Sequence, residues 1–294
     1  MKKIAFLFLV IDNPNFPKIW DSYFRGHKDK YNIYIHPKYP LQTTWKKKNI
    51  INNLHETGWG FITKAYIELL KVAYENPDNY KFVTISESCI PIQSFEQFYN
   101  DCINDPNSWI KTMKISKYNY ESRIKLQENK LKPQYFLKTY ARFCLNRTHV
   151  KLLLLKSKEL EFFHKMHIGD EFFLSVLYPL KNYKDFAVTY DDWDYVDKQK
   201  REIKNKIKEY YEIQENKDIN KSKNIKILRN LYNNISKNPK TIINVEDDLD
   251  KIKNCKSYFY RKFSKDSNID KYWKSIIMYH TKLPGEPGNK GVGP

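Results

Sequence analysis

The sequence predicts an α/β protein in which a layered mixed sheet is flanked by helices. Residues 4–10 form a continuous apolar run, IAFLFLV, which is typical of a strand covered on both faces, as in parallel sheets. Before residue 90 the patterns alternate strand, helix, strand, helix, strand, the order typical of α/β layers. Ligands of such domains bind beyond the carboxyl ends of the strands.

The N-terminal elements follow from local patterns. The first strand ends at the turn-forming sequence Asp12-Asn13-Pro14, and a second, closed by Pro37, covers 31–36. Apolar residues at helical spacing predict a helix at 61–74. The remaining elements expected in this part are helices at 17–26 and 94–104 and a strand at 81–85.

In the second half, residues 140–145 predict a strand that runs into a helix ending near 155. Gly169-Asp170-Glu171 precedes the apolar stretch 172–177, a pattern typical of a helix N-terminus with two carboxylates in its first turn. Strands are expected at 187–190 and 257–263, and a closing helix at 269–278.

One domain is expected over residues 1–282. Within it, residues 198–237 are rich in Lys, Glu and Asn with sparse apolar positions, which predicts a charged helical insertion. Residues 283–294 carry glycine at every third position for three triplets, too few for a collagen helix. We expect a disordered Gly-x-y tail there and exclude it from the fold.

Composition narrows the classes of function. Lys+Arg 52 against Asp+Glu 34 gives a net charge of +18, so an anionic partner must be considered. Of eight glycines, Gly285, Gly288, Gly291 and Gly293 stand in the C-terminal segment, so neither a dinucleotide fingerprint nor a P-loop can be written. Four dispersed cysteines support neither a zinc site nor a disulfide framework, which favours a reducing, cytoplasmic location. The apolar run at 4–11 is shorter than the roughly 20 residues of a transmembrane helix, so no such segment is expected.

Two groups of residues are candidates for chemistry. Glu171, directly after a glycine and Asp170, is placed to act as a general base for a sugar hydroxyl, or only to complement a helix N-terminus. Arg261 and Lys262, among aromatic residues near the end of a strand, can hold a diphosphate in place of a divalent ion, or form an ordinary solvated basic pair.

Weaker candidates accompany them. Asp191, Asp192 and Asp194 could instead ligate Mg²⁺ or Mn²⁺, although runs of aspartate are common in loops. Trp59, between two glycines, is placed either to stack on a ligand or to anchor a turn by packing. His36 and the pair Glu87-Ser88 stand at strand ends, where contacts to a nucleoside are expected.

Several segments in collinear order resemble the core-2/I-branching β-1,6-N-acetylglucosaminyltransferase family, most closely its plant-type branch. Ser86–Ile92 (SESCIPI) and Arg261–Phe263 (RKF) carry most of the resemblance. The other matching segments are 3–9, 31–37, 169–173, 188–193 and 238–241.

The resemblance implies a GT-A-like (Rossmann-like) fold and an inverting, metal-independent transfer of GlcNAc or xylose from a UDP-sugar to a glycan or protein hydroxyl. No cofactor is implied. By the same resemblance, Glu171 is the catalytic base, Arg261 and Lys262 hold the diphosphate, and Lys240 is a second cation. The donor pocket is expected to include Val10, His36, Trp59, Glu87 and Ser88.

The chain also departs from the family pattern. His36 stands where animal members have an acidic residue that contacts the nucleoside, and 138–142 match an acceptor-side motif poorly, which leaves donor and acceptor open. Secretory members carry a membrane anchor and paired cysteines, which this sequence does not show. A basic nucleic-acid-binding protein is one alternative, although the lysines are spread along the chain. A glycan-binding relative without turnover is the other.

Overall fold

The computed structural model describes residues 1–115, 121, 133–213, 221–235 and 238–282. A mixed six-stranded sheet has the order β2-β1-β3-β8-β5-β9. Its strands are β1 (Lys3–Val10), β2 (Tyr31–Pro37), β3 (Asn79–Ser86), β5 (Ser108–Trp109), β8 (Cys144–Asn146) and β9 (Tyr183–Lys184). β1 pairs in parallel with β2 and β3, whereas β8 is antiparallel to β3 and β5. The predicted fold class is confirmed, with the layered architecture expected of a GT-A-like fold.

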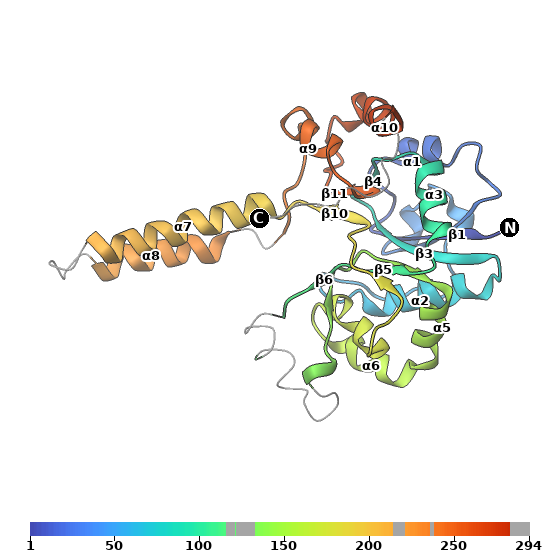
Figure 1. The fold of residues 1–294 in the computed structure, drawn as a ribbon, viewed down its shortest axis with the longest axis horizontal. Helices are drawn as coiled ribbons and strands as arrows, with labels where there is room; N and C mark the ends of the chain where they lie inside the picture. The colour runs from blue at the N-terminus through green and yellow to red at the C-terminus, as the bar shows by residue number, and fades with distance from the viewer. Residues whose placement is uncertain (116–120, 122–132, 214–220, 236–237, 283–294) are drawn as a thin grey trace.

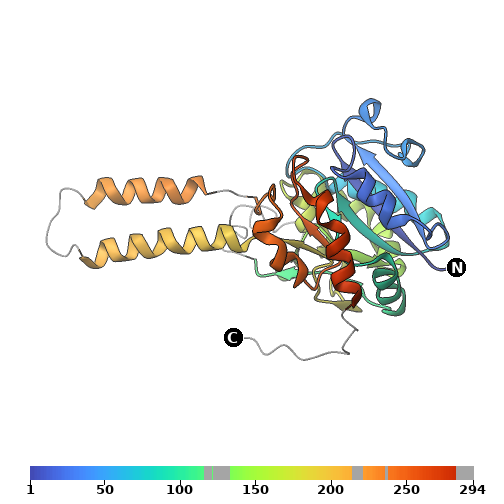
Figure 2. The same ribbon diagram turned by 90° about the horizontal axis from the view of Figure 1, so that it is seen from above.

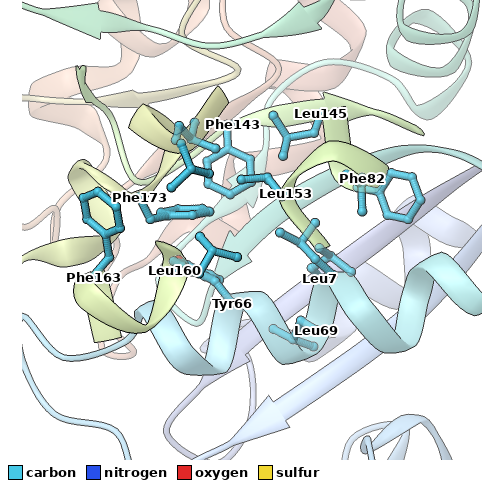
Figure 3. Close-up of a cluster of buried hydrophobic side chains, with 14 of the residues drawn as sticks. Leu7, Tyr66, Leu69, Phe82, Phe143, Leu145, Leu153, Leu160, Phe163 and Phe173 are labelled. Carbon is cyan, nitrogen blue, oxygen red and sulfur yellow. The ribbon is translucent and has the colours of Figure 1, made fainter. Parts of the chain in front are cut away.

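Strand β1 is the centre of the core because both of its faces are covered. Ala5, Leu7 and Leu9 belong to one apolar cluster, and the alternate positions from Ile4 to Val10 belong to a second. The first cluster packs against helices α2 (Thr63–Glu75), α5 (Arg147–Leu155) and α6 (Ser157–Lys165) (Figure 3). Helices α1 (Pro17–Phe24) and α3 (Phe95–Asn104) contribute residues to the second. The continuous apolar pattern of residues 4–10 follows from this two-sided burial.

A second, smaller sheet lies at the carboxyl end of β3. It consists of β10 (Thr189–Asp191), β11 (Phe259–Arg261) and β4 (Ile90–Pro91), with β11 in the middle. β4 begins shortly after β3 ends at Ser86, so the chain passes directly from one sheet into the other. Helices α9 (Leu249–Lys253) and α10 (Trp273–Lys282) pack against this part. The second sheet thereby brings C-terminal residues to the strand ends of the first.

The charged insertion is a pair of helices that projects from the body of the protein (Figure 1). Helices α7 (Asp194–Ile213) and α8 (Lys221–Asn234) lie side by side in both views (Figure 2). The backbone N–H of Lys240 donates to the carbonyl oxygen of Asp192 at 2.8 Å, so the chain leaves and re-enters the body at one place. The helical prediction holds for the described part of 198–237, although α7 begins earlier, at Asp194.

Three expectations need correction or fall outside the described residues. Residues 169–177 are not an α-helix but two 3₁₀ turns, η6 (Gly169–Glu171) and η7 (Phe173–Leu177), separated at Phe172, whose φ is −126°. Most of the strand expected at 140–145 is loop, and β8 begins only at Cys144. The predicted Gly-x-y tail at 283–294 lies outside the described residues. Within the described part of the chain, no helix has both the length and the apolarity needed to cross a bilayer.

Candidate active site

The ends of the three parallel strands bring four of the predicted site residues to one edge of the sheet. In the pairing register, Leu9 lies beside both His36 of β2 and Ser86 of β3. Val10, the last residue of β1, is therefore next to His36, and Glu87 and Ser88 follow directly at the end of β3. Parallel strands end together at such an edge, which is where ligands of α/β sheets bind.

The segment after β11 joins this edge. The backbone N–H of Phe263 donates to the carbonyl oxygen of Ser88 at 3.1 Å, and the Asn15 side chain donates to the carbonyl oxygen of Phe263 at 2.8 Å. The backbone N–H of Asn15 in turn donates to the carbonyl oxygen of Glu87, also at 2.8 Å. These bonds place Lys262 beside Glu87 and Ser88, although the sequence separates them widely.

Lys262 is a partly desolvated cation. Burial and the neighbouring positive charge of Arg261 lower the pKa of its ammonium group, and the carboxylate of Glu87 opposes that shift. Among the described residues no ion pair is found for its side chain. A desolvated ammonium group of this kind gains strongly from an anionic ligand, because opposite charge stabilises its protonated form.

Arg261 is held in place by Asp191. The two residues are register partners in β11 and β10, and Nη1 of Arg261 donates to Oδ1 of Asp191. The side chain of Arg261 is 15% exposed, and its Nε is buried without a hydrogen-bond partner in the described residues. The ion pair orients a guanidinium group that still has N–H donors to spare.

The aspartate run that could have ligated a metal is engaged in ion pairs. Besides the Arg261–Asp191 pair, Lys251 Nζ lies 2.6 Å from Asp192 and 2.8 Å from Asp194. Hydrogen bonding to Lys251 lowers the pKa of Asp194. Across the described ranges, no group of three or more His, Cys, Asp or Glu residues is arranged to hold a metal ion.

Lys240, the expected second cation for the diphosphate, has a carboxylate partner in the structure. Its backbone N–H lies beside Asp192, but its ammonium group forms an ion pair with both carboxylate oxygens of Asp248, at 2.7 and 2.9 Å. Asp248 is 6% exposed, and the side chain of Lys240 is 29% exposed, so this pair is partly buried. Lys240 thus has a carboxylate partner already, unlike Lys262.

Glu171 lies on the tight turn η6. Its Oε2 is 3.3 Å from Lys138 Nζ, and its carboxylate is 28% exposed, so the group is accessible while one cation restrains it. The turn requires glycine at position 169, because a Cβ there would lie 2.1 Å from the carbonyl oxygen of Phe163. Packing of this turn onto α6 therefore decides where the carboxylate of Glu171 points.

Trp59 belongs to the Glu171 side of the site. The backbone N–H of Ile168 donates to the carbonyl oxygen of Gly60 at 2.6 Å, and the rings of Trp59 and His167 lie 5.1 Å apart. Trp59 is 62% exposed. The indole is thus an open apolar surface beside the turn that carries Glu171.

His36 is wholly buried, so its ring presents no surface to a ligand. It has no exposed surface, and its Nε2 accepts a hydrogen bond from the backbone N–H of His55 at 2.9 Å. Burial lowers the pKa of His36 to about 4, and His55 adds to the effect while Glu68 opposes it. The neutral ring therefore fixes the segment around His55 next to the end of β2.

The charges of the candidate site act on two tyrosines, Tyr66 and Tyr140. Burial raises the pKa of Tyr66 to about 12, and the charges of Arg142 and Arg261 oppose this shift while Asp170 adds to it. Asp191 and Glu171 both raise the pKa of Tyr140, after the larger effect of its burial. Arg261 thus acts electrostatically on the buried Tyr66, and Glu171 acts on the half-buried Tyr140.

Arg142 was not singled out by the sequence patterns. The available signal was a charged residue directly before the apolar stretch 143–145, in a segment expected to be a buried strand. Among so many basic residues, that signal is weak. The structure makes it specific because Arg142 is only 9% exposed.

Comparisons with known proteins identify the family of this chain. The profile of the Core-2/I-Branching enzyme family matches residues 4–223, which include the strand ends and Glu171. The chain is also 28% identical over 130 residues to Glycosyltransferase BC10 of Oryza sativa subsp. japonica, a stretch that covers 40% of this chain and 33% of the rice protein. The chain thus spans about a third of that relative's length. The resemblance predicted from the sequence motifs is confirmed: the chain belongs to the Core-2/I-branching enzyme family.

Proposed function

We propose that this protein is an inverting, metal-independent glycosyltransferase that moves a sugar, GlcNAc or xylose, from a UDP-sugar to a hydroxyl of a glycan or protein. Family membership and the glycosyltransferase name of the rice relative support the class of reaction. The observation that carries the proposal is the meeting of Lys262 with Glu87 and Ser88 at the strand ends. It puts a partly desolvated cation where an α/β sheet binds its ligand.

In the proposed reaction, Glu171 accepts the proton of the acceptor hydroxyl as that oxygen attacks the anomeric carbon of the donor. The bond between the anomeric carbon and the β-phosphate oxygen breaks in the same displacement, so the configuration inverts. The electron pair of the broken bond remains on UDP. Lys138, 3.3 Å from the Glu171 carboxylate, holds that carboxylate in position for the transfer.

Arg261 and Lys262 would stabilise the negative charge that develops on the departing diphosphate. Preorganised cations contribute most where water is excluded; the side chain of Arg261 is 15% exposed, and Lys262 is half-buried. Asp191 orients Arg261 without using all of its donors.

The donor pocket would be shaped by Val10, His36, Glu87 and Ser88, and Trp59 would offer a stacking surface. Lys240 would contribute only through long-range electrostatic attraction, because its ammonium group forms an ion pair with Asp248.

The engagement of Asp191, Asp192 and Asp194 with Arg261 and Lys251 supports metal independence, because these carboxylates already have cationic partners. A divalent ion there would have to displace a lysine or an arginine. The cytoplasmic location belongs to the same proposal and rests on the four free cysteines.

Thermal unfolding with a panel of nucleotides tests the donor assignment. A ligand that binds the native state adds RT ln(1 + [L]/Kd) to the free energy of unfolding, about 2.7 kcal/mol at a hundredfold excess over Kd. The midpoint temperature rises accordingly. We expect UDP to stabilise the protein, and ADP and GDP to do so much less. Equal stabilisation by all three, or by none, would contradict a uridine nucleotide site.

Chelation tests the metal assignment. Release of UDP from UDP-GlcNAc and from UDP-xylose should proceed at the same rate with EDTA and with Mn²⁺. A strict requirement for Mn²⁺ would instead assign the Asp191–Asp194 segment to metal binding.

A further inference from the structure

Arg142 is a buried cation for which the described residues show no partner. It lies in the loop between β7 (Lys138–Thr139) and β8, is 9% exposed, and its Nε is fully buried without a hydrogen-bond partner in that part of the chain. Nor does any described carboxylate lie within ion-pair distance of its guanidinium group. An arginine in this state is costly, because a buried charge is tolerated only when it is paired and hydrogen-bonded.

The backbone around Arg142 is held firmly against β3. Thr84 Oγ1 accepts a hydrogen bond from the backbone N–H of Phe143 at 3.0 Å, and the backbone N–H of Thr84 donates to the carbonyl oxygen of Phe143 at 3.1 Å. Thr84 stands two positions before Ser86, the last residue of β3. The backbone next to Arg142 is therefore fixed close to the strand ends.

The charges around Arg142 belong to the candidate site. Its positive charge opposes the rise of the Tyr66 pKa that burial causes, and it adds to the lowering of the Lys262 pKa by burial and Arg261; Asp191 and Asp170 interact with it favourably. Asp191 is already paired with Arg261. The hydroxyl of Tyr66 is a further buried donor without a partner among the described residues.

We infer that Arg142 is a third cationic ligand of the donor diphosphate, acting with Arg261 and Lys262. This inference rests on the proposed function. Guanidinium groups suit such a ligand because their planar donors match two phosphate oxygens at once. The incoming diphosphate would supply the anionic acceptors that the described structure does not give to Arg142, and Tyr66 would stand behind it as a positioning residue.

Arg142→Met separates this role from a purely structural one. Methionine keeps much of the apolar volume of the side chain and removes the charge. Calorimetric titration with UDP and with uridine, on wild-type and variant protein, is the measurement. We expect the Kd for UDP to rise at least tenfold and the Kd for uridine to stay within twofold, because only UDP carries the phosphates. The melting temperature of the free variant should be equal or higher, since an unpaired buried charge is removed.

Arg229→Met is the matched control, because Arg229 is exposed on the projecting helix α8 and its loss changes net charge equally. It should leave both affinities unchanged. Should Arg142→Met fail to fold, Arg142→Lys replaces it, with an expected weakening of UDP binding alone. Unchanged UDP binding in the Arg142 variant, or equal weakening of UDP and uridine, would overturn the inference. Wild-type protein that binds neither ligand would overturn the proposed function itself.

Discussion

A single residue at a strand end, His36, makes the stability of the protein depend on pH. Its ring is wholly buried and accepts a hydrogen bond from His55, so the folded protein favours the neutral form. The pKa of His36 falls from 6.5 to about 4 on folding. The unfolded chain therefore binds a proton below about pH 6.5 that the folded protein takes up only near pH 4.

The free energy of unfolding should therefore fall as the pH drops from about 6.5 to about 4, with His36 contributing about 3 kcal/mol of the loss. In His36→Gln, the amide oxygen can still accept from His55 but does not titrate. Urea unfolding across this pH range should show a shallower slope for the variant than for wild type. Parallel slopes would contradict the assignment of this proton to His36.

The sequence patterns did not indicate the partners of the candidate site residues. The family resemblance assigned Glu87, Ser88 and Lys262 to one expected donor site, and in the structure the bond between Phe263 and Ser88 brings them together. By contrast, the ion pair of Lys240 with Asp248 depends on the fold of 241–248, which carries no periodic pattern. Burial of Arg142 was equally hidden, because solvent exposure of a single arginine is a property of the tertiary structure.

Among the elements, the turn that carries Glu171 depends most on one residue. Gly169 lies so close to α6 that a Cβ would meet the carbonyl oxygen of Phe163 at 2.1 Å and Oγ1 of Thr63 at 2.9 Å. Both atoms belong to packed helices and cannot move freely. Substitution at this position should therefore displace the turn and its carboxylate.

Gly169→Ala should lower the free energy of unfolding by about 1–3 kcal/mol or more, the usual cost of overpacking. Gly58→Ala is the matched control, since a Cβ at that position would meet nothing within 4 Å and its φ is not in the left-handed region. The control should stay within about 0.5 kcal/mol of wild type. Equal stabilities of the two variants in chemical denaturation would contradict this packing.

Long elements were easier to predict than short ones. Strands β1 to β3 and helices α2 and α3 have long apolar patterns. Strands β10 and β11 overlap the ranges expected at 187–190 and 257–263, although each has only three residues, whereas β4, with two residues, shows no pattern of its own. Residues 169–177 combine helix-type sequence signals with a 3₁₀ geometry that close packing at Gly169 imposes.

For the whole molecule, the projecting pair of helices α7 and α8 is an addition to a body that closes without it. The hydrogen bond between Lys240 and Asp192 joins the two ends of the insertion. Val196, at the base of α7, is 1% exposed and belongs to the body, whereas most described residues further along α7 are exposed. The helices therefore stabilise each other more than they stabilise the sheets.

Replacing residues 201–235 with a short Gly/Ser linker should leave a folded protein with an intact site. The hydrogen bond between Lys240 and Asp192 holds the chain together at the base of the insertion, where it leaves and re-enters the body. A cooperative thermal transition near that of wild type, with unchanged Kd for UDP, is the expected result. Loss of cooperative unfolding would show that the insertion is an integral part of the core.

The most direct test of the proposed mechanism compares Glu171→Gln with Glu159→Gln, an exposed carboxylate on α6. Removing a general base costs about 10²–10⁴-fold in rate. We expect that loss in the kcat of sugar transfer for Glu171→Gln, with the Kd for UDP within twofold of wild type and Glu159→Gln unaffected. Equal kcat values for wild type and Glu171→Gln would contradict a catalytic base at this turn.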